Sequence, residues 1–149
     1  MKHYEEQTRG TFQRIDCANQ LVSFTGMKFR GRNGLDNVTP TDIDGCIQLD
    51  YQNCIIFFEL KHSGDAPTGQ MNALATLADK VQAGGANCIV LVAVHNTNAP
   101  EVIIAKDAIV VASYRKGKWT NVDYSRGFTL LYCINEYIRW IERNNIGAT

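Results

Sequence analysis

A chain of 149 residues has the length of one domain, and we expect a single domain over residues 1–149. Its 15 Lys and Arg balance 15 Asp and Glu, so the zero net charge favours no class of charged partner, although it does not exclude a basic stripe. The 45% hydrophobic share is typical of a globular protein, and the longest apolar run, Cys88–Val94, is too short to cross a bilayer.

The chain contains five cysteines, an odd number, and none of them forms a Cys-x-x-Cys pair. This pattern argues against a zinc site and against a disulfide framework, and it favours free buried thiols in a reducing compartment. The first six residues, Met-Lys-His-Tyr-Glu-Glu, lack the apolar core of a signal peptide. We therefore expect a cytoplasmic protein with no membrane partner.

The first part of the chain predicts a helix, an irregular segment and a hairpin. Side chains at helical spacing predict a helix over Tyr4–Val22, which Gly10 weakens by about 1 kcal/mol relative to Ala. Glycine, asparagine and proline predict a loop or short irregular strands over Ser23–Thr41. Two strands follow, Ile43–Leu49 and Asn53–Lys61, and their connection is short enough for a hairpin.

The second part of the chain alternates helices and strands. Its predicted elements are a helix over 71–81 that ends at Gly84-Gly85, a buried strand over Cys88–Val94, a strand over Ile109–Ser113, a turn at Lys116–Lys118 into a strand around Trp119, and a helix over Phe128–Arg143. This order predicts an α/β fold with a mixed central sheet flanked by helices.

The candidate chemistry lies on the two strands of the predicted hairpin. Side chains alternate across a strand, so Glu59 and Lys61 share a face, although residues 54–58 before them are all apolar. Burying two charges costs several kcal/mol each unless they are paired or hold a metal. Asp44 is nearly symmetric with Glu59 about the turn, so the two can converge with Cα atoms about 5 Å apart. Two carboxylates suit a hard divalent cation, and a lysine can polarise a water near a phosphate.

These residues resemble the motif of the PD-(D/E)XK nuclease superfamily, an acidic residue followed after a gap by Glu or Asp, any residue, and Lys. The motif here is Asp44 or Asp42, then Glu59-Leu60-Lys61, and Gln70 stands at a helix start where several of its families carry glutamine. The clear match covers 39–94, and its Asp-Ile-Asp-Gly form resembles phage-type and Holliday-junction-resolvase-type members. The resemblance implies a restriction-endonuclease-like αβββαβ core. The motif's name begins Pro-Asp, whereas Pro40 is followed by Thr41.

The resemblance implies a DNA-cleaving hydrolase that uses Mg²⁺ or Mn²⁺. Asp44, Glu59 and the Leu60 backbone carbonyl would hold the metal, while Lys61 would position the attacking water and give 5′-phosphate products. Branched or structured DNA is a candidate substrate. A small nuclease that cuts both strands is expected to form a homodimer.

The choice between the two aspartates depends on the hairpin register. Asp42 lies two residues beyond Asp44, roughly 6.6 Å further along the strand, and would overshoot Glu59. Gly45 also lets backbone, ion or substrate approach closely beside Asp44. We therefore expect Asp44 to be the principal ligand, with Asp42 orienting Lys61 or holding a second ion. A bulge or a longer turn would bring Asp42 inward instead.

Two basic stretches are candidate nucleic-acid contacts, with a solvated loop as the alternative for each. They are Lys28, Arg30 and Arg32 before the motif, and Arg115, Lys116 and Lys118 in the predicted turn.

The other candidates have plainer explanations as well. Glu5 and Glu6 could supply an accessory acid or simply favour the first turn of a helix. Gln70 could cap its helix, and Glu59 with Lys61 could form a structural ion pair. Two non-catalytic functions stay open: a nucleic-acid-binding or interaction module that retains the nuclease fold, which the intact motif disfavours, and an inhibitor or interaction protein, which only the neutral charge supports.

Overall fold

The structure is a computed structural model that describes residues 29–30, 37–38, 43–63 and 68–144. The chain divides into two compact units, Met1–Thr41 and Asp42–Thr149. In the first unit, β1 (Phe29–Arg30) pairs antiparallel with β2 (Asn37–Val38). These short strands fall in the segment predicted as loop or irregular strand. The helix predicted over 4–22, including Glu5 and Glu6, lies outside the described residues.

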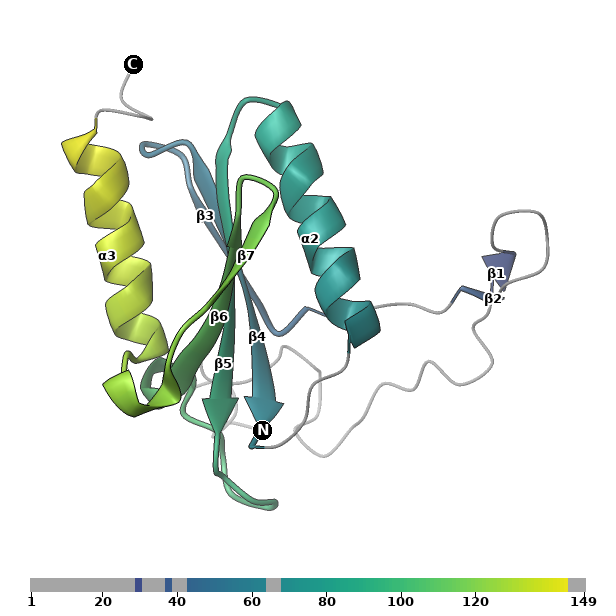
Figure 1. The fold of residues 1–149 in the computed structure, drawn as a ribbon, viewed down its shortest axis with the longest axis vertical. Coiled ribbons are helices and arrows are strands. Elements are labelled where there is room, and N and C mark those ends of the chain that lie inside the picture. The colour runs from purple at the N-terminus through teal and green to yellow at the C-terminus, as the bar shows by residue number, and fades with distance from the viewer. Residues whose placement is uncertain (1–28, 31–36, 39–42, 64–67, 145–149) are drawn as a thin grey trace, which may run out of the picture. The chain divides into compact units, whose positions relative to one another are not determined.

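The second unit contains a five-stranded sheet in the order β3-β4-β5-β6-β7. Its elements are β3 (Gly45–Leu49), β4 (Cys54–His62), α2 (Thr68–Ala83), β5 (Asn87–His95), a 3-10 turn at Ala105–Asp107, β6 (Ile109–Arg115), β7 (Lys118–Asn121), a 3-10 turn at Tyr124–Arg126, and α3 (Leu130–Arg143). Strands β4 and β5 are parallel, and the other neighbouring pairs are antiparallel. The predicted α/β architecture, a mixed sheet flanked by helices, is confirmed (Figure 1).

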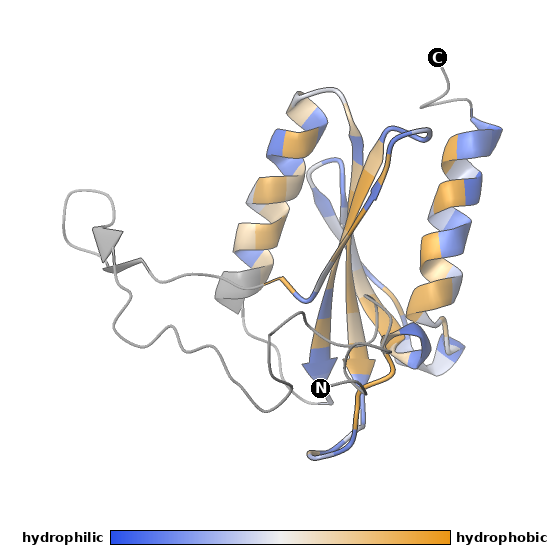
Figure 2. Cartoon of the chain, turned by 180° about the vertical axis from the view of Figure 1, so that it is seen from behind, coloured by the Kyte–Doolittle hydropathy of each residue, from blue (hydrophilic) through white to orange (hydrophobic). Residues whose placement is uncertain are grey.

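The sheet separates two apolar layers, one beneath each helix. On one face, Leu74 and Ala78 of α2 pack with Phe57 and Val90. On the other face, Leu130 and Ile141 of α3 belong to a buried cluster that contains Ile56 and Leu91. The hydrophobic central strands therefore lie between the two helices (Figure 2). None of the described helices is both long and apolar enough to cross a membrane.

The hairpin of β3 and β4 sets the position of the candidate site. Gly45 pairs with Phe58 and Leu49 pairs with Cys54, so the register is continuous. The turn runs from Asp50 to Asn53, one residue longer than predicted, because Asn53 adopts a left-handed φ of 49° and its amide donates to Asp50 O at 3.1 Å. The predicted hairpin is confirmed, and extending its register by one residue places Asp44 across from Glu59.

The later elements are present as predicted, with ends that differ from the predicted ones by up to three residues, and the predicted helix stop at Gly84-Gly85 is confirmed. Helix α2 stops at Ala83, and Gly85 adopts a φ of 100° that a side chain would disfavour. Lys116 and Gly117, with φ values of 51° and 78°, form the two-residue turn between β6 and β7. Thr129 caps α3 by accepting a hydrogen bond from the Tyr132 amide at 3.1 Å.

A buried tyrosine joins α2 to the sheet, and its ionisation is expected to destabilise the fold at alkaline pH. Tyr114 of β6 donates to Asp79 Oδ1 of α2 at 2.7 Å, and this hydrogen bond, with burial, raises the pKa of Tyr114 above its ordinary value. A tyrosine whose pKa is raised by folding stabilises the folded state as long as the pH is below the pKa of the unfolded chain, which is about 10. This stabilisation is lost as the pH rises through the higher pKa of the folded state.

We expect Tyr114→Phe to have a lower urea unfolding midpoint than wild type at neutral pH. The difference between the two midpoints should become smaller above pH about 10. Urea unfolding at both pH values measures this. A difference that stays constant with pH would contradict the assignment.

Candidate functional site

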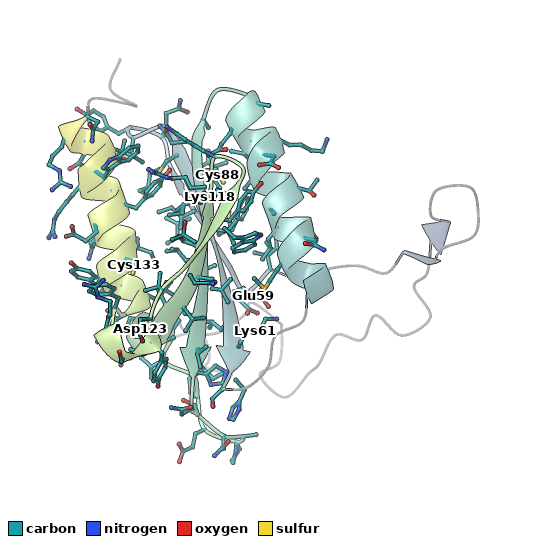
Figure 3. All side chains as sticks on the ribbon, viewed as in Figure 1. Glu59, Lys61, Cys88, Lys118, Asp123 and Cys133 are labelled. Atoms are coloured by element: carbon teal, nitrogen blue, oxygen red, sulfur yellow. The ribbon has the colours of Figure 1, made fainter. Side chains whose placement is uncertain are left out.

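Two oppositely charged side chains are buried near the end of β4. Lys61 Nζ lies 3.0 Å from Glu59 Oε1, and the two side chains are 9% and 3% exposed. They are the only charged residues among those described that are buried. Both lie on the face of β4 that α2 covers, which is the face of Phe57, and Figure 3 shows them beside the first turns of α2. The shared face predicted from strand alternation is confirmed.

Asp44 approaches the same place from the neighbouring strand. It directly precedes β3, is half-buried, and its Oδ2 accepts a hydrogen bond from the Leu60 amide at 2.7 Å. The N–H and C=O of one strand residue point to the same neighbouring strand, so the Leu60 carbonyl also lies on the Asp44 side of β4. Three possible oxygen ligands therefore lie at this end of the hairpin: the carboxylates of Asp44 and Glu59 and the carbonyl of Leu60.

Gly45 makes this close pairing of the strands possible. A Cβ added at Gly45 would lie 1.9 Å from Cζ of Phe58, the residue opposite it. The close approach that Gly45 permits is thus to a phenyl ring, rather than to the ion or substrate considered from the sequence. The ring lies over Gly45, next to the point where Asp44 meets Leu60.

The donor chemistry fits a hard divalent cation. Mg²⁺ usually takes one or two carboxylates and keeps several waters, so a carboxylate pair with a carbonyl matches Mg²⁺ or Mn²⁺. Within 43–63 and 68–144, no group of three or more His, Cys, Asp or Glu side chains is arranged to hold a metal. Any ion here would therefore depend on two carboxylates, a carbonyl and water.

The remaining residues of the predicted motif are only partly described. Gln70 lies in the first turn of α2, as predicted, but its side chain is not described. Asp42 lies outside the described residues. The preference for Asp44 over Asp42 therefore stays a prediction, supported by the register of the hairpin.

The basic residues of the β6–β7 turn lie away from these oxygens. The Arg115 guanidinium is 4.4 Å from the centre of the Trp140 ring, and Lys116 Nζ is 5.9 Å from it. Tyr114 pairs with Val90, whereas Lys61 pairs with Val94, roughly 13 Å further along β5 at about 3.3 Å per residue. Lys118 begins β7 in the same hairpin. The structure thus places this basic stretch at the opposite end of the sheet.

The other basic stretch belongs to the first unit. The backbone of Arg30 lies in β1, while Lys28 and Arg32 lie outside the described residues. Their contact with nucleic acid stays a prediction.

The described cysteines are not candidate nucleophiles. Cys46, Cys54, Cys88 and Cys133 are free thiols. Desolvation raises the pKa of each thiol, although Cys46 and Cys133 are not fully buried, and it raises that of Cys88 to about 12, so the reactive thiolate is disfavoured. The prediction of buried thiols is confirmed for Cys54 and Cys88 but is wrong for Cys46, which is exposed because it lies on the edge strand β3.

Two histidines that the sequence did not connect lie side by side. His62 and His95 are register partners at the ends of the parallel strands β4 and β5, with ring centres 5.4 Å apart. The available signal was the strand–helix–strand order, since such units usually place their strands parallel and adjacent.

Comparisons with known proteins add no assignment. No protein-family model, no curated protein and no solved structure matches the chain. Function is therefore inferred from the residues and their geometry.

Proposed function

We propose that the protein is a metal-dependent deoxyribonuclease that hydrolyses phosphodiester bonds in DNA, in the manner of the PD-(D/E)XK nucleases that its sequence resembles. One observation carries the proposal. A buried Glu59–Lys61 pair ends a central apolar strand, and Asp44 on the neighbouring strand binds the Leu60 amide between them. Acidic, carbonyl and ammonium groups are thereby gathered at one end of a hairpin.

A purely structural ion pair explains this arrangement less well. Desolvation costs several kcal/mol per buried ion, and replacing a buried pair by apolar residues is often neutral or stabilising. The preceding residues of β4 are apolar, so Leu or Val at both positions would continue the pattern. Retaining two charges here therefore supports a chemical role.

Each group of the proposed site has a distinct role. Asp44, Glu59 and the Leu60 carbonyl would hold Mg²⁺ or Mn²⁺. The bound ion would supply charge stabilisation at the scissile phosphate. The Lys61 ammonium has three N–H donors, which is the chemistry required to bind both a carboxylate and a water or phosphate oxygen. Glu59 orients this ammonium at 3.0 Å.

The finer fold is also part of the proposal. The run β3-β4-α2-β5 would correspond to the strand–strand–helix–strand portion of an αβββαβ core. The helix and the third strand of that core would have to come from residues before β3. Branched DNA is the substrate that the resolvase-type resemblance favours, and cutting of both strands would require a homodimer.

Cleavage of a substrate panel tests this function. We expect the purified protein to cut labelled junction, flap, duplex or single-stranded DNA in Mn²⁺ or Mg²⁺, and not in EDTA, leaving 5′-phosphate ends. No cleavage of any substrate, together with metal-independent DNA binding, would favour the binding module instead.

Asp44→Asn should lower the cleavage rate by roughly 100-fold or more, because charge stabilisation of several kcal/mol is lost and each 1.4 kcal/mol or so is tenfold in rate. Asparagine keeps an oxygen that can accept from the Leu60 amide, so the melting temperature should change little. Asp50→Asn, at the exposed turn of the same hairpin, is the matched control. Equal rates for the two variants would remove Asp44 from the site.

A further inference from the structure

The two histidines occupy the edge of the sheet where a parallel pair of strands ends. His62 and His95 are the last residues of β4 and β5, and the Ser63 amide donates to His95 O at 3.1 Å, which extends the pairing one residue further. In open α/β sheets, ligands bind outside the carboxyl ends of parallel strands. His62 is exposed and His95 is partly exposed, so a ligand can reach this edge.

The tautomer of His95 is set by a backbone amide two residues further along the chain. The Thr97 amide donates to His95 Nδ1 at 3.2 Å. An amide N–H cannot accept, so Nδ1 carries no proton and the ring proton of the neutral imidazole must be on Nε2. His95 therefore has one ring N–H donor, on Nε2, and such a donor can bind an anionic oxygen.

His62 holds the His95 ring in place. The two rings meet edge to face, with an interplanar angle of 88°. His62 Nε2 lies 3.0 Å from Asn98 Oδ1, and Nδ1 lies 3.3 Å from Ser63 O. A neutral ring has one N–H donor, so it can donate to only one of these oxygens, and the shorter contact, to Asn98, is the one that positions the ring. The loop after β5 thus orients both rings: Thr97 sets one and Asn98 the other.

We propose that His95 Nε2–H binds a phosphate oxygen at this edge, with His62 as a positioning residue, and that the phosphate belongs to the DNA strand beside the cleavage site. Lys61 directly precedes His62 in β4, so the two histidines lie at the same end of the strand as the candidate active site, although on the opposite face of the sheet, and a strand that crosses this edge would reach both. Neutral N–H donors of this kind fix the register of a strand through its backbone without reading its sequence. That this site binds a phosphate is inferred from the geometry of the two histidines alone. That the phosphate belongs to DNA rests on the proposed nuclease function.

Two substitutions of His95 distinguish phosphate binding by its Nε2–H donor from a role of the ring in packing alone. In His95→Asn, the amide oxygen can replace Nδ1 as the acceptor for Thr97, but the Nε2–H donor is lost. In His95→Gln, the amide nitrogen reaches the position of Nε2 and restores that donor. We expect His95→Asn to bind duplex or junction DNA about tenfold more weakly in Ca²⁺, and His95→Gln to bind within about threefold of wild type. Thermal melting of each variant checks that the fold is retained.

A second measurement uses dimethyl phosphate, a phosphodiester without bases. Titration should give a saturable shift of the His95 Nε2 signal in the ¹⁵N spectrum of wild type, and no comparable shift at the neighbouring ring nitrogens of the Asn variant. A shift without DNA binding by wild type would support the phosphate subsite and count against the nuclease. DNA affinity unchanged in a folded Asn variant, or no shift at His95, would overturn the subsite while leaving the nuclease proposal intact.

Discussion

Replacing Glu59 and Lys61 together, by Leu and Met, should give a protein at least as stable as wild type that has lost metal-dependent cleavage. The pair is almost fully buried, and substitution of such pairs by apolar residues of similar volume is often neutral or stabilising by about 1–4 kcal/mol. Cleavage should be abolished because a metal ligand and the ammonium are both removed. Urea unfolding and cleavage in Mn²⁺, measured on the same preparation, test the two parts of this expectation.

The single variants are the internal controls for this experiment. Lys61→Met leaves the buried Glu59 carboxylate without its ammonium, so it should destabilise the fold by about 3–5 kcal/mol. Glu59→Gln keeps the shape of the side chain, so it should be the better-folded inactive variant. A double variant that is several kcal/mol less stable than wild type would identify a structural ion pair. A stable double variant that still cleaves DNA would reject the proposed active site.

The candidate site was predictable to the extent that it depends on local register. Alternation along β4 places Glu59 and Lys61 on one face, and a short turn places Asp44 across from Glu59, whatever the rest of the sheet does. The turn was one residue longer than expected because Asn53 is held by a distant group: its side chain donates to Gly85 O, beyond α2, at 3.1 Å. A local pattern cannot contain that contact.

Long-range contacts account for what the sequence did not predict. His62 and His95 meet only because β4 and β5 pair across the whole of α2. Arg115 reads as a free basic residue in its own turn, yet it lies over Trp140 of α3. In each case the chemistry of the residue depends on a partner more than 20 positions away, which charge patterns and periodicity do not identify.

Gly45→Ala should both destabilise the protein and impair the site. The added Cβ would lie 1.9 Å from Phe58 Cζ and 2.2 Å from Cε1, so the ring or the strand must move. Phe58 packs against the apolar layer beneath α3, so displacing the ring strains the core, at a cost of about 1–3 kcal/mol. If β3 moves instead, Asp44 is drawn away from the Leu60 amide and the cleavage rate falls. Urea unfolding and cleavage assays measure both effects.

A double-mutant cycle tests whether the Phe58 ring causes the loss of stability in Gly45→Ala. The penalty of Ala at position 45 should be much smaller when Phe58 is also replaced by Ala, because the clash then has no ring to act on. Gly84→Ala is the matched control, since a Cβ there comes no nearer than 3.4 Å to its closest neighbour, Val81 O. The same penalty for Gly45→Ala with and without the phenyl ring would mean that Gly45 is required for its backbone rather than for the room it leaves. In that case the close packing of β3 on β4 would not be what holds Asp44 against Leu60.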